Sequence, residues 1–300
     1  MPFPPPYGPI RQAFLDGQII PFLGAGASLA ARVPPGNAWA AASAFLPNGS
    51  ELADHLAKES GFPPGEARDL AKVAQYFHVQ AGRSLLHKEL RKIFQRAYAP
   101  LPIHGLLASA QKPLLVVTTN YDSLIEQAFA SANKPYDLVI HTTDSQIGER
   151  IYHRAHGEMT LNKVVPRKLL IDLGTRSVVY KIHGSCDAAD PTKDQYVITE
   201  DDYIDFLSRM VKNTAIPAFC AEPFQCWPFL FIGYRLGDWN MRVVLNRISP
   251  TVRLEQGIKS WAIERAPSAL EERFWMTRGV NVYPKPIDDF VTELSALGSI

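Results

Sequence analysis

The chain has 300 residues, of which 46% are hydrophobic, so it can bury a full core and is near the upper size of one undivided domain. Its formal net charge of +1 gives no sequence-wide attraction to nucleic acid, and no apolar run reaches the roughly 18 residues needed to cross a membrane. The cysteines Cys186, Cys220 and Cys226 are too few for a disulfide framework, and with an amino terminus unlike a signal peptide they favour a cytoplasmic protein.

The amino-terminal part contains a leader and a first strand. Residues 1–10 read MPFPPPYGPI, and their prolines predict a leader that lies extended on the surface. The apolar run at 18–23 predicts a buried strand, which ends at the small residues 24–28, GAGAS. Such a loop lets a phosphate approach backbone amides at the start of a helix. Because Leu29 occupies the third glycine position of GxGxxG, an ordinary tight turn remains an open alternative.

A helical region follows the first strand. Residues 39–107 interrupt the alternation of strands and helices, and helical spacing at 66–80 and 83–96 predicts two helices between proline-bearing loops. We therefore expect a helical insertion within a single domain that covers residues 1–300.

The second predicted strand, at 113–118, delivers the polar residues TTNYD and then a helix at 123–132. Asn120 or Asp122 could simply cap that helix. The density of polar groups at one strand end also indicates ligand contact, since an amide and a carboxylate can bind a carboxamide, a water or a ribose. Both interpretations stay open.

Residues 142–176 have no clear period, so they predict either a small strand-bearing excursion or a mobile lid. His156 and Gly157 offer a candidate catalytic histidine, but no apolar strand leads into them. His153 and His156 could also hold a metal, although no acidic or cysteine cluster completes such a site.

The strongest candidate for a general base is His183. The apolar run at 177–182 predicts a buried strand that ends in His183-Gly184-Ser185, so it presents an imidazole at the same edge as TTNYD, with room beside it. A helix is expected at 203–211.

The carboxyl-terminal third repeats the pattern. A predicted strand at 228–232 ends in Gly233 and Tyr234, and Asp238 and Asn240 precede a helix at 241–248. A strand at 259–263 is followed by Glu264, which either contacts a ribose or is a solvated surface residue. A helix at 268–278, a strand at 280–283 and a helix at 287–297 complete the chain.

This alternation predicts an α/β fold with a doubly wound, mostly parallel sheet. In such folds the ligand lies at the carboxyl ends of the strands, where the connecting loops converge. Apart from His153 and His156, the candidate residues above follow predicted strands and therefore belong to one edge.

Four motifs in this order, GAGAS, TTNYD, KIHG and FIGYRLGDWN, resemble the sirtuin family, most closely its bacterial defence-associated, sirtuin-like NAD hydrolases. The resemblance implies a Rossmann-like sirtuin fold that binds NAD as substrate, with His183 and Asn120 as catalytic residues. It implies pyrophosphate contacts from Gly24, Ala25, Gly26 and Ser28, nicotinamide and ribose contacts from Thr119, Asn120 and Asp122, adenosine contacts from Gly233 and Tyr234, and a ribose contact from Glu264.

One departure from the family decides between activities. Protein-deacylating sirtuins carry a four-cysteine zinc module after the HG motif, and this chain lacks the cysteines for it, so no metal is expected. The resemblance therefore implies hydrolysis of NAD to nicotinamide and ADP-ribose, in a homo-oligomer gated for anti-phage defence, with a P-loop ATPase as a candidate partner. An NAD-dependent deacylase and a non-catalytic module that binds NAD or ADP-ribose remain alternatives.

Overall fold

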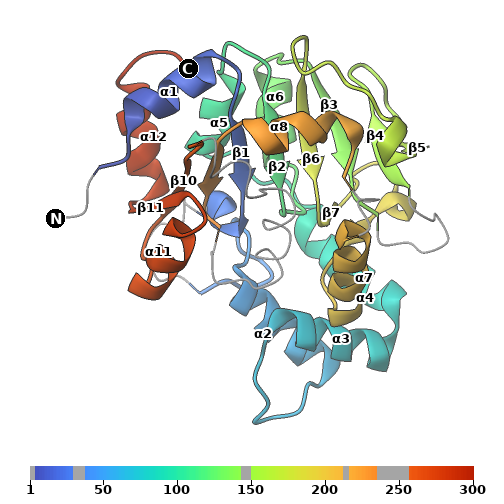
Figure 1. The fold of residues 1–300 in the computed structure, drawn as a ribbon. Helices are drawn as coiled ribbons and strands as arrows, with labels where there is room; N and C mark the ends of the chain where they lie inside the picture. Colours follow the sequence, from blue (N-terminus) through green and yellow to red (C-terminus); the bar gives the residue numbers. More distant parts are fainter. Residues whose placement is uncertain (1–3, 30–37, 143–149, 212–215, 235–256) are drawn as a thin grey trace.

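The computed structural model describes residues 4–29, 38–142, 150–211, 216–234 and 257–300. Within these residues, nine strands form one sheet in the order β11-β10-β9-β1-β2-β6-β3-β4-β5 (Figure 1). The strands of this sheet are β1 (Ile20–Leu23), β2 (Leu115–Thr118), β3 (Tyr136–Ile140), β4 (Ile151–Arg154), β5 (Asn162–Val164), β6 (Ser177–Lys181), β9 (Phe229–Ile232), β10 (Ser260–Glu264) and β11 (Val280–Pro284).

The helices lie around this sheet, and a two-stranded sheet pairs β7 (Gly184–Ser185) with β8 (Gln195–Tyr196). The α-helices are α1 (Tyr7–Leu15), α2 (Gly49–Ser60), α3 (Leu70–Ala81), α4 (Arg83–Phe94), α5 (Pro102–Ala108), α6 (Leu124–Ser131), α7 (Glu200–Val211), α8 (Ala221–Cys226), α11 (Ala269–Met276) and α12 (Ile287–Ser295). Short 3-10 helices are η1 (Ala25–Ser28), η3 (Pro166–Lys168), η4 (Pro191–Lys193) and η5 (Ala218–Cys220). No helix of the described residues is long and apolar enough to cross a membrane.

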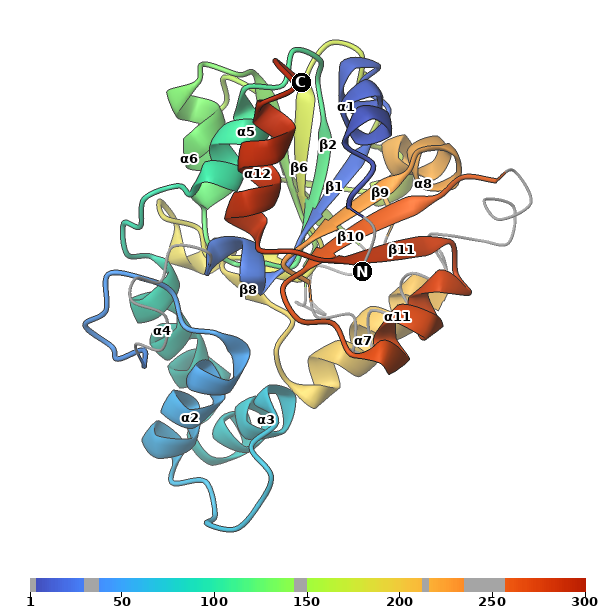
Figure 2. The same ribbon diagram turned by 90° about the vertical axis from the view of Figure 1, so that its left-hand side faces the viewer.

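The seven strands from β11 to β3 run parallel to one another, which confirms the predicted fold class. All residues of β1, β2, β6 and β9 are buried. Helices therefore cover both faces, as the near-continuous apolar runs predict. In Figure 2, α5, α6 and α12 lie on one side of the strands and α8 and α11 on the other. One face buries Phe14, Leu107, Phe129 and Phe290, and the other buries Phe206, Phe224 and Trp275.

The extended leader predicted for residues 1–10 is wrong from Tyr7 onward. Pro6 is the N-cap of α1, and Pro9 lies in its first turn, where the missing N–H of a proline breaks no bond within the helix. The side chains of Ile10 and Phe14 are fully buried, and the Tyr7 ring stacks on Phe290 with centroids 5.6 Å apart. The burial of this apolar stripe explains why the segment is helical.

Helices α2, α3 and α4 form a separate group with its own apolar cluster, below the sheet in both ribbon views (Figures 1 and 2). The sequence predicted α3 and α4 but missed α2. A capping box joins Asn48 and Glu51 at the start of α2, and its apolar stripe includes Leu52 and Leu56. The Asn48-x-x-Glu51 spacing was the available sequence signal.

The sheet also contains strands that the sequence did not predict. Strand β3 extends the parallel part beside β6, and β4 and β5 continue from it as antiparallel neighbours. The described part of 142–176 is thus a strand-bearing excursion. The helix expected at 241–248 lies outside the described residues, as do Asp238 and Asn240.

Candidate functional site

The candidate site lies where three adjacent strands, β1, β2 and β6, end at the same level. Leu23 pairs with Thr118, and Thr118 pairs with Lys181. The residues that follow these three positions are the glycine loop, Asn120 and His183. The sheet register therefore brings together the three motifs that the sequence placed at one edge.

The glycine loop turns sharply into η1 instead of a longer helix. The N–H of Gly26 donates to the Gly233 carbonyl at 2.7 Å, and the N–H of Ala27 donates to the Gly24 carbonyl at 3.0 Å. These two amides are therefore bonded within the protein, and Ala25 is the exposed residue of the turn. The helix expected after Leu29 falls largely outside the described residues.

Gly233 explains why this loop needs glycine. Its φ is +61°, and a Cβ there would lie 2.2 Å from the Ala27 nitrogen. A Cβ on Gly24 or Gly26 would lie 2.7 Å from Gly233 atoms. The two turns are therefore in backbone contact, a role that the sequence did not reveal. Tyr234 is buried, and its ring packs edge-on against Phe22 at 5.6 Å.

A polar network connects the glycine loop to TTNYD. The Asn120 side chain donates from Nδ2 to the Gly24 carbonyl and to Ser28 Oγ, both at 3.0 Å. Ser28 Oγ donates to Asp122 Oδ2 at 2.9 Å, and Asp122 Oδ1 accepts the N–H of Leu124 at 3.1 Å. Asp122 therefore bonds the first residue of α6 and also orients the glycine loop, whereas ligand contact by this motif stays a prediction. The neighbouring Thr119 is half-buried, and its N–H donates to the Leu23 carbonyl at 3.2 Å.

Lys181 lies beneath this network and was missed by the sequence analysis. Its side chain is fully buried, and Nζ donates to Glu126 Oε1 at 2.7 Å and to the Asp122 carbonyl. A buried charge requires such partners. A lysine inside an otherwise apolar strand was the sequence signal for a buried ion pair.

His183 is buried at the end of β6, between aromatic rings of α7. Its ring centroid lies 5.5 Å from that of Tyr203 and 5.2 Å from that of Phe206, both nearly perpendicular. Burial lowers the pKa of His183 from 6.5 to about 3. The imidazole is neutral at physiological pH and can accept a proton.

A second buried histidine follows β3. Burial, then the positive charge of Arg209 and then His183 lower the pKa of His141 to about 3. The His141 and Phe206 ring centroids are 5.0 Å apart, and the same Phe206 ring also packs against His183. His141 Nδ1 has no hydrogen-bond partner within the described structure. The sequence signal for His141 is a histidine directly after the apolar run YDLVI, which was not predicted as a strand.

Other candidates lie elsewhere. Because β4 runs antiparallel to β3, His156 follows the opposite end of the sheet, where it is exposed. His153 Nε2 lies 2.9 Å from Asp137 Oδ2. Glu264 ends β10, two strands away from β1. Across the described residues, no group of three or more His, Cys, Asp or Glu side chains is arranged to hold a metal ion.

Comparison with known proteins places this geometry in a family. Residues 114–283 match the family model described as SIR2-like domain, a range that includes Asn120 and His183 but not the glycine loop. The chain is 27% identical to NAD(+) hydrolase ThsA of Bacillus cereus over 75% of its own length and 42% of that relative. It is 30% identical to NAD(+) hydrolase ThsA of Acinetobacter baumannii over 67% of its length and 36% of that relative.

A third relative extends the similarity along the chain. Defense-associated sirtuin 2 of Bacillus subtilis is 24% identical over 91% of this chain and 24% of its own length. The chain thus spans less than half the length of these curated relatives. Since the family match covers more than half of the chain and includes the strand ends β2 and β6, the chain belongs to the SIR2-like domain family.

Proposed function

We propose that this chain is an NAD hydrolase that cleaves the nicotinamide-ribosyl bond and releases nicotinamide and ADP-ribose. The observation that carries the proposal is the meeting of Ser28, Asn120 and His183 at three adjacent strand ends. Matching relatives named NAD(+) hydrolase support the choice of reaction.

The proposed contacts follow the positions of the strand ends. Both Nδ2 hydrogens of Asn120 are bonded within the protein, which leaves Oδ1 to accept from a water or a ribose hydroxyl. Ala25 is exposed at the loop that would meet the pyrophosphate. The assigned substrate contacts are Gly24, Ala25, Gly26 and Ser28 for the pyrophosphate, Thr119, Asn120 and Asp122 for nicotinamide and its ribose, Gly233 and Tyr234 for the adenosine half, and Glu264 for a ribose hydroxyl.

In the proposed reaction the bond between the ribose carbon and the nicotinamide nitrogen breaks, and nicotinamide leaves with the electron pair. Water held by Asn120 attacks the ribosyl cation, and His183 accepts the proton. An oxygen newly bonded to a cationic carbon is strongly acidic, so a neutral imidazole with a low pKa is a sufficient base. Orientation of substrate and water by the three loops lowers the barrier further.

Incubation of the purified chain with NAD, followed by chromatographic separation of the products, tests this function. Equal amounts of nicotinamide and ADP-ribose are expected without any second substrate. Nicotinamide release that requires an acyl-lysine peptide and yields O-acyl-ADP-ribose would instead establish a deacylase. Saturable NAD binding in calorimetry without any product would establish a binding module.

The biological setting is part of the same proposal. We place the reaction in the cytoplasm, in anti-phage defence through NAD depletion, with a homo-oligomer and a P-loop ATPase partner as the gate on activity. The name of one relative, Defense-associated sirtuin 2, supports the defence role.

We also retain residues 1–300 as one NAD-binding domain, with 39–107 as a helical insertion. Size-exclusion chromatography with light scattering tests the oligomer, and a monomer with full activity would contradict gating by assembly.

A further inference from the structure

The chain leaves the site after His183 and returns to it as a tight hairpin of β7 and β8. Gly184 pairs with Tyr196, and the N–H of Val197 donates to the His183 carbonyl at 2.8 Å. Gly184 has φ +92°, and a Cβ there would lie 2.1 Å from the Gln195 carbonyl oxygen. The two arms therefore touch beside His183, so the position of this histidine depends on the hairpin staying closed.

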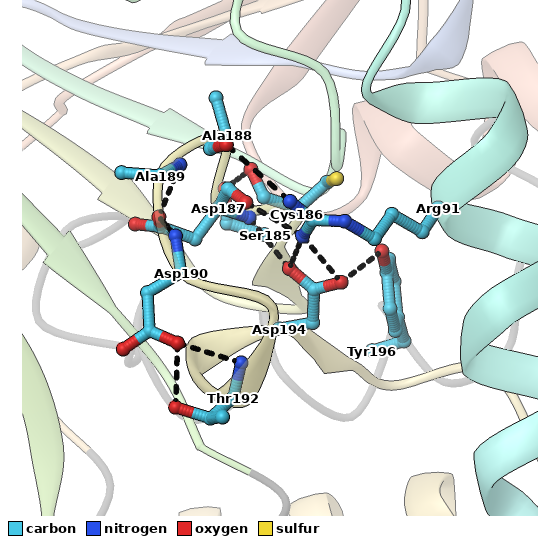
Figure 3. Close-up of polar contacts among 10 residues, drawn as sticks. All are labelled: Arg91, Ser185, Cys186, Asp187, Ala188, Ala189, Asp190, Thr192, Asp194 and Tyr196. Carbon is cyan, nitrogen blue, oxygen red and sulfur yellow. Dashed lines mark hydrogen bonds and ion pairs between the residues drawn. The ribbon is translucent and has the colours of Figure 1, made fainter.

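A single arginine of α4 joins the two arms of this hairpin. Arg91 Nη1 donates to Asp194 at 2.8 Å (Oδ1) and 3.0 Å (Oδ2), and to the Asp187 carbonyl at 2.7 Å. The N–H of Asp187 donates to Asp194 Oδ1 at 2.8 Å. Figure 3 shows Arg91 reaching from α4 to the Asp194 carboxylate, with Asp187 on the opposite arm.

The Arg91–Asp194 pair joins a buried carboxylate to a half-buried arginine, unlike the ion pairs on the surface of the same helical group. The Asp194 side chain is 3% exposed and that of Arg91 is 14% exposed, whereas Arg68 and Asp54 are both more than half exposed. Removing one partner of a buried pair leaves an uncompensated charge, while exposed pairs contribute little. The closed hairpin thus depends on Arg91.

The hairpin also contacts the other half of the site through Tyr121, which lies between Asn120 and Asp122. The N–H of Cys186 donates to the Tyr121 carbonyl at 3.1 Å, and Tyr121 Oη donates to the Val197 carbonyl at 2.6 Å. The Tyr121 and Tyr196 rings meet edge-on at 5.1 Å. One element therefore links His183 to the TTNYD segment.

A second arginine of α4 supports the same segment. Arg83 Nη1 donates to Asp202 Oδ1 at 2.6 Å, and Nη2 donates to the Tyr196 carbonyl at 3.3 Å. Asp202 Oδ2 accepts the N–H groups of Ile198 and Thr199, at the start of α7. Helix α7 carries the rings that pack on His183, so α4 holds the hairpin at both ends.

We propose that Arg91 is a positioning residue for NAD hydrolysis, which acts through Asp194 to keep the β7–β8 hairpin closed and thereby fixes His183 relative to Asn120. The proposal rests on the proposed function only for its activity measurement. Arg91 itself lies on α4, outside the substrate contacts assigned above, so its effect falls on the turnover number and not on substrate affinity.

The activity test compares Arg91→Ala with Arg91→Lys, and uses Arg68→Ala as the control for loss of an ion pair in the same helical group. Steady-state nicotinamide release should show kcat reduced about tenfold or more in Arg91→Ala, with KM changed by less than about twofold. Arg91→Lys should recover part of kcat, because it keeps the charge but loses the planar guanidinium that also donates to the Asp187 and Ala188 carbonyls. Arg68→Ala should match the wild type.

Amide hydrogen exchange of peptides covering residues 183–198 gives a measurement that does not need activity. In Arg91→Ala the N–H groups of Cys186 and Val197 should exchange faster, while peptides from β1 should be unchanged. If Arg91→Ala does not fold, Asp194→Asn replaces it in both measurements, since it keeps the side-chain shape and removes the charge.

The two proposals fail in different ways. An inactive wild type would contradict NAD hydrolysis by the chain alone, and hydrogen exchange would then decide whether Arg91 holds the hairpin closed. An active wild type with Arg91→Ala indistinguishable from Arg68→Ala, or with KM raised at unchanged kcat, would overturn the positioning role.

Discussion

The histidines of the parallel and antiparallel parts of the sheet differ in their hydrogen-bond partners. At the antiparallel edge, the buried carboxylate of Asp137 accepts from the N–H of His156 at 3.0 Å and from Arg176 at 3.4 Å, and pairs with His153 at 2.9 Å. At the parallel strand ends, His183 is buried among rings, and no described side chain hydrogen-bonds to its imidazole.

This contrast separates a histidine in a structural network from the proposed general base. The His153 network satisfies its own polar groups, as buried polar groups in stable structures do. The His183 imidazole has no side-chain hydrogen bond among the described residues, and burial lowers its pKa so that the ring stays neutral. A neutral imidazole that is not held by a carboxylate is able to accept a proton, so the comparison favours the parallel edge as the active site.

The largest predicted effect compares His183→Ala with His153→Ala. The first substitution removes the proton acceptor and should lower the initial rate of nicotinamide release about 10³-fold, within the usual range for loss of a general base. The second should leave the rate per folded molecule unchanged and cost about 1–3 kcal/mol of stability, because Asp137 loses one partner. Equal loss of rate in both variants would remove the distinction between the two edges.

Two glycines with positive φ angles, one at each edge of the sheet, compare the two edges by the free energy of unfolding. A Cβ on Gly233 meets the Ala27 nitrogen at 2.2 Å, whereas a Cβ on Gly157, at the antiparallel edge, meets nothing within 4 Å. Gly233→Ala should lower the free energy of unfolding by about 3 kcal/mol or more, from strain and overlap together. Gly157→Ala should cost about 1 kcal/mol, from strain alone.

Urea unfolding monitored by circular dichroism measures both glycine variants. The difference between them isolates the overlap, since both positions have positive φ, +61° and +86°. A similar cost in the two variants would mean that the glycine loop can move away from Gly233, and the rigid contact between the two turns would then be incorrect.

The sequence predicted the parallel part of the fold because burial on both faces leaves a clear signal. Strands such as β9, Phe229–Ile232, read as apolar runs that end at glycine or polar residues. The same rule placed His183 and Asn120 at one edge, since parallel strands end together. Strand β3 was missed because YDLVI is short and begins soon after α6, and β5 is a short edge strand with two exposed residues.

Long-range side-chain pairs could not be predicted from one sequence. Arg91 and Asp194 are 103 residues apart, and each is an ordinary charged residue in its local segment. The contact of Gly233 with Gly26 likewise depends on how β1 and β9 pair. The low pKa of His183 arises from burial by α7 residues, which the local motif does not contain. Local patterns give the elements, and tertiary packing gives the charge states.

The smallest predicted effect concerns pH and compares buried His141 with exposed His156. Because the pKa of His141 falls from 6.5 to about 3 on folding, the unfolded chain binds more protons than the native state between these values. His141 therefore costs no stability above pH 6.5 and lowers stability as the pH falls toward 3. Its contribution to the slope is at most about 1.4 kcal/mol per pH unit.

His141→Gln should flatten the dependence of unfolding free energy on pH between 6.5 and 4.5, whereas His156→Gln should leave the slope as in the wild type. Urea unfolding at several pH values gives the slopes, which are compared instead of absolute stabilities because the glutamine itself can change packing. The remaining slope in His141→Gln has known sources, since burial also lowers the pKa of His183 to about 3 and that of His87 to about 4. Parallel curves for both variants would show that His141 is protonated equally in the folded and unfolded chains. The assignment of a neutral buried imidazole at the end of β3 would then be wrong.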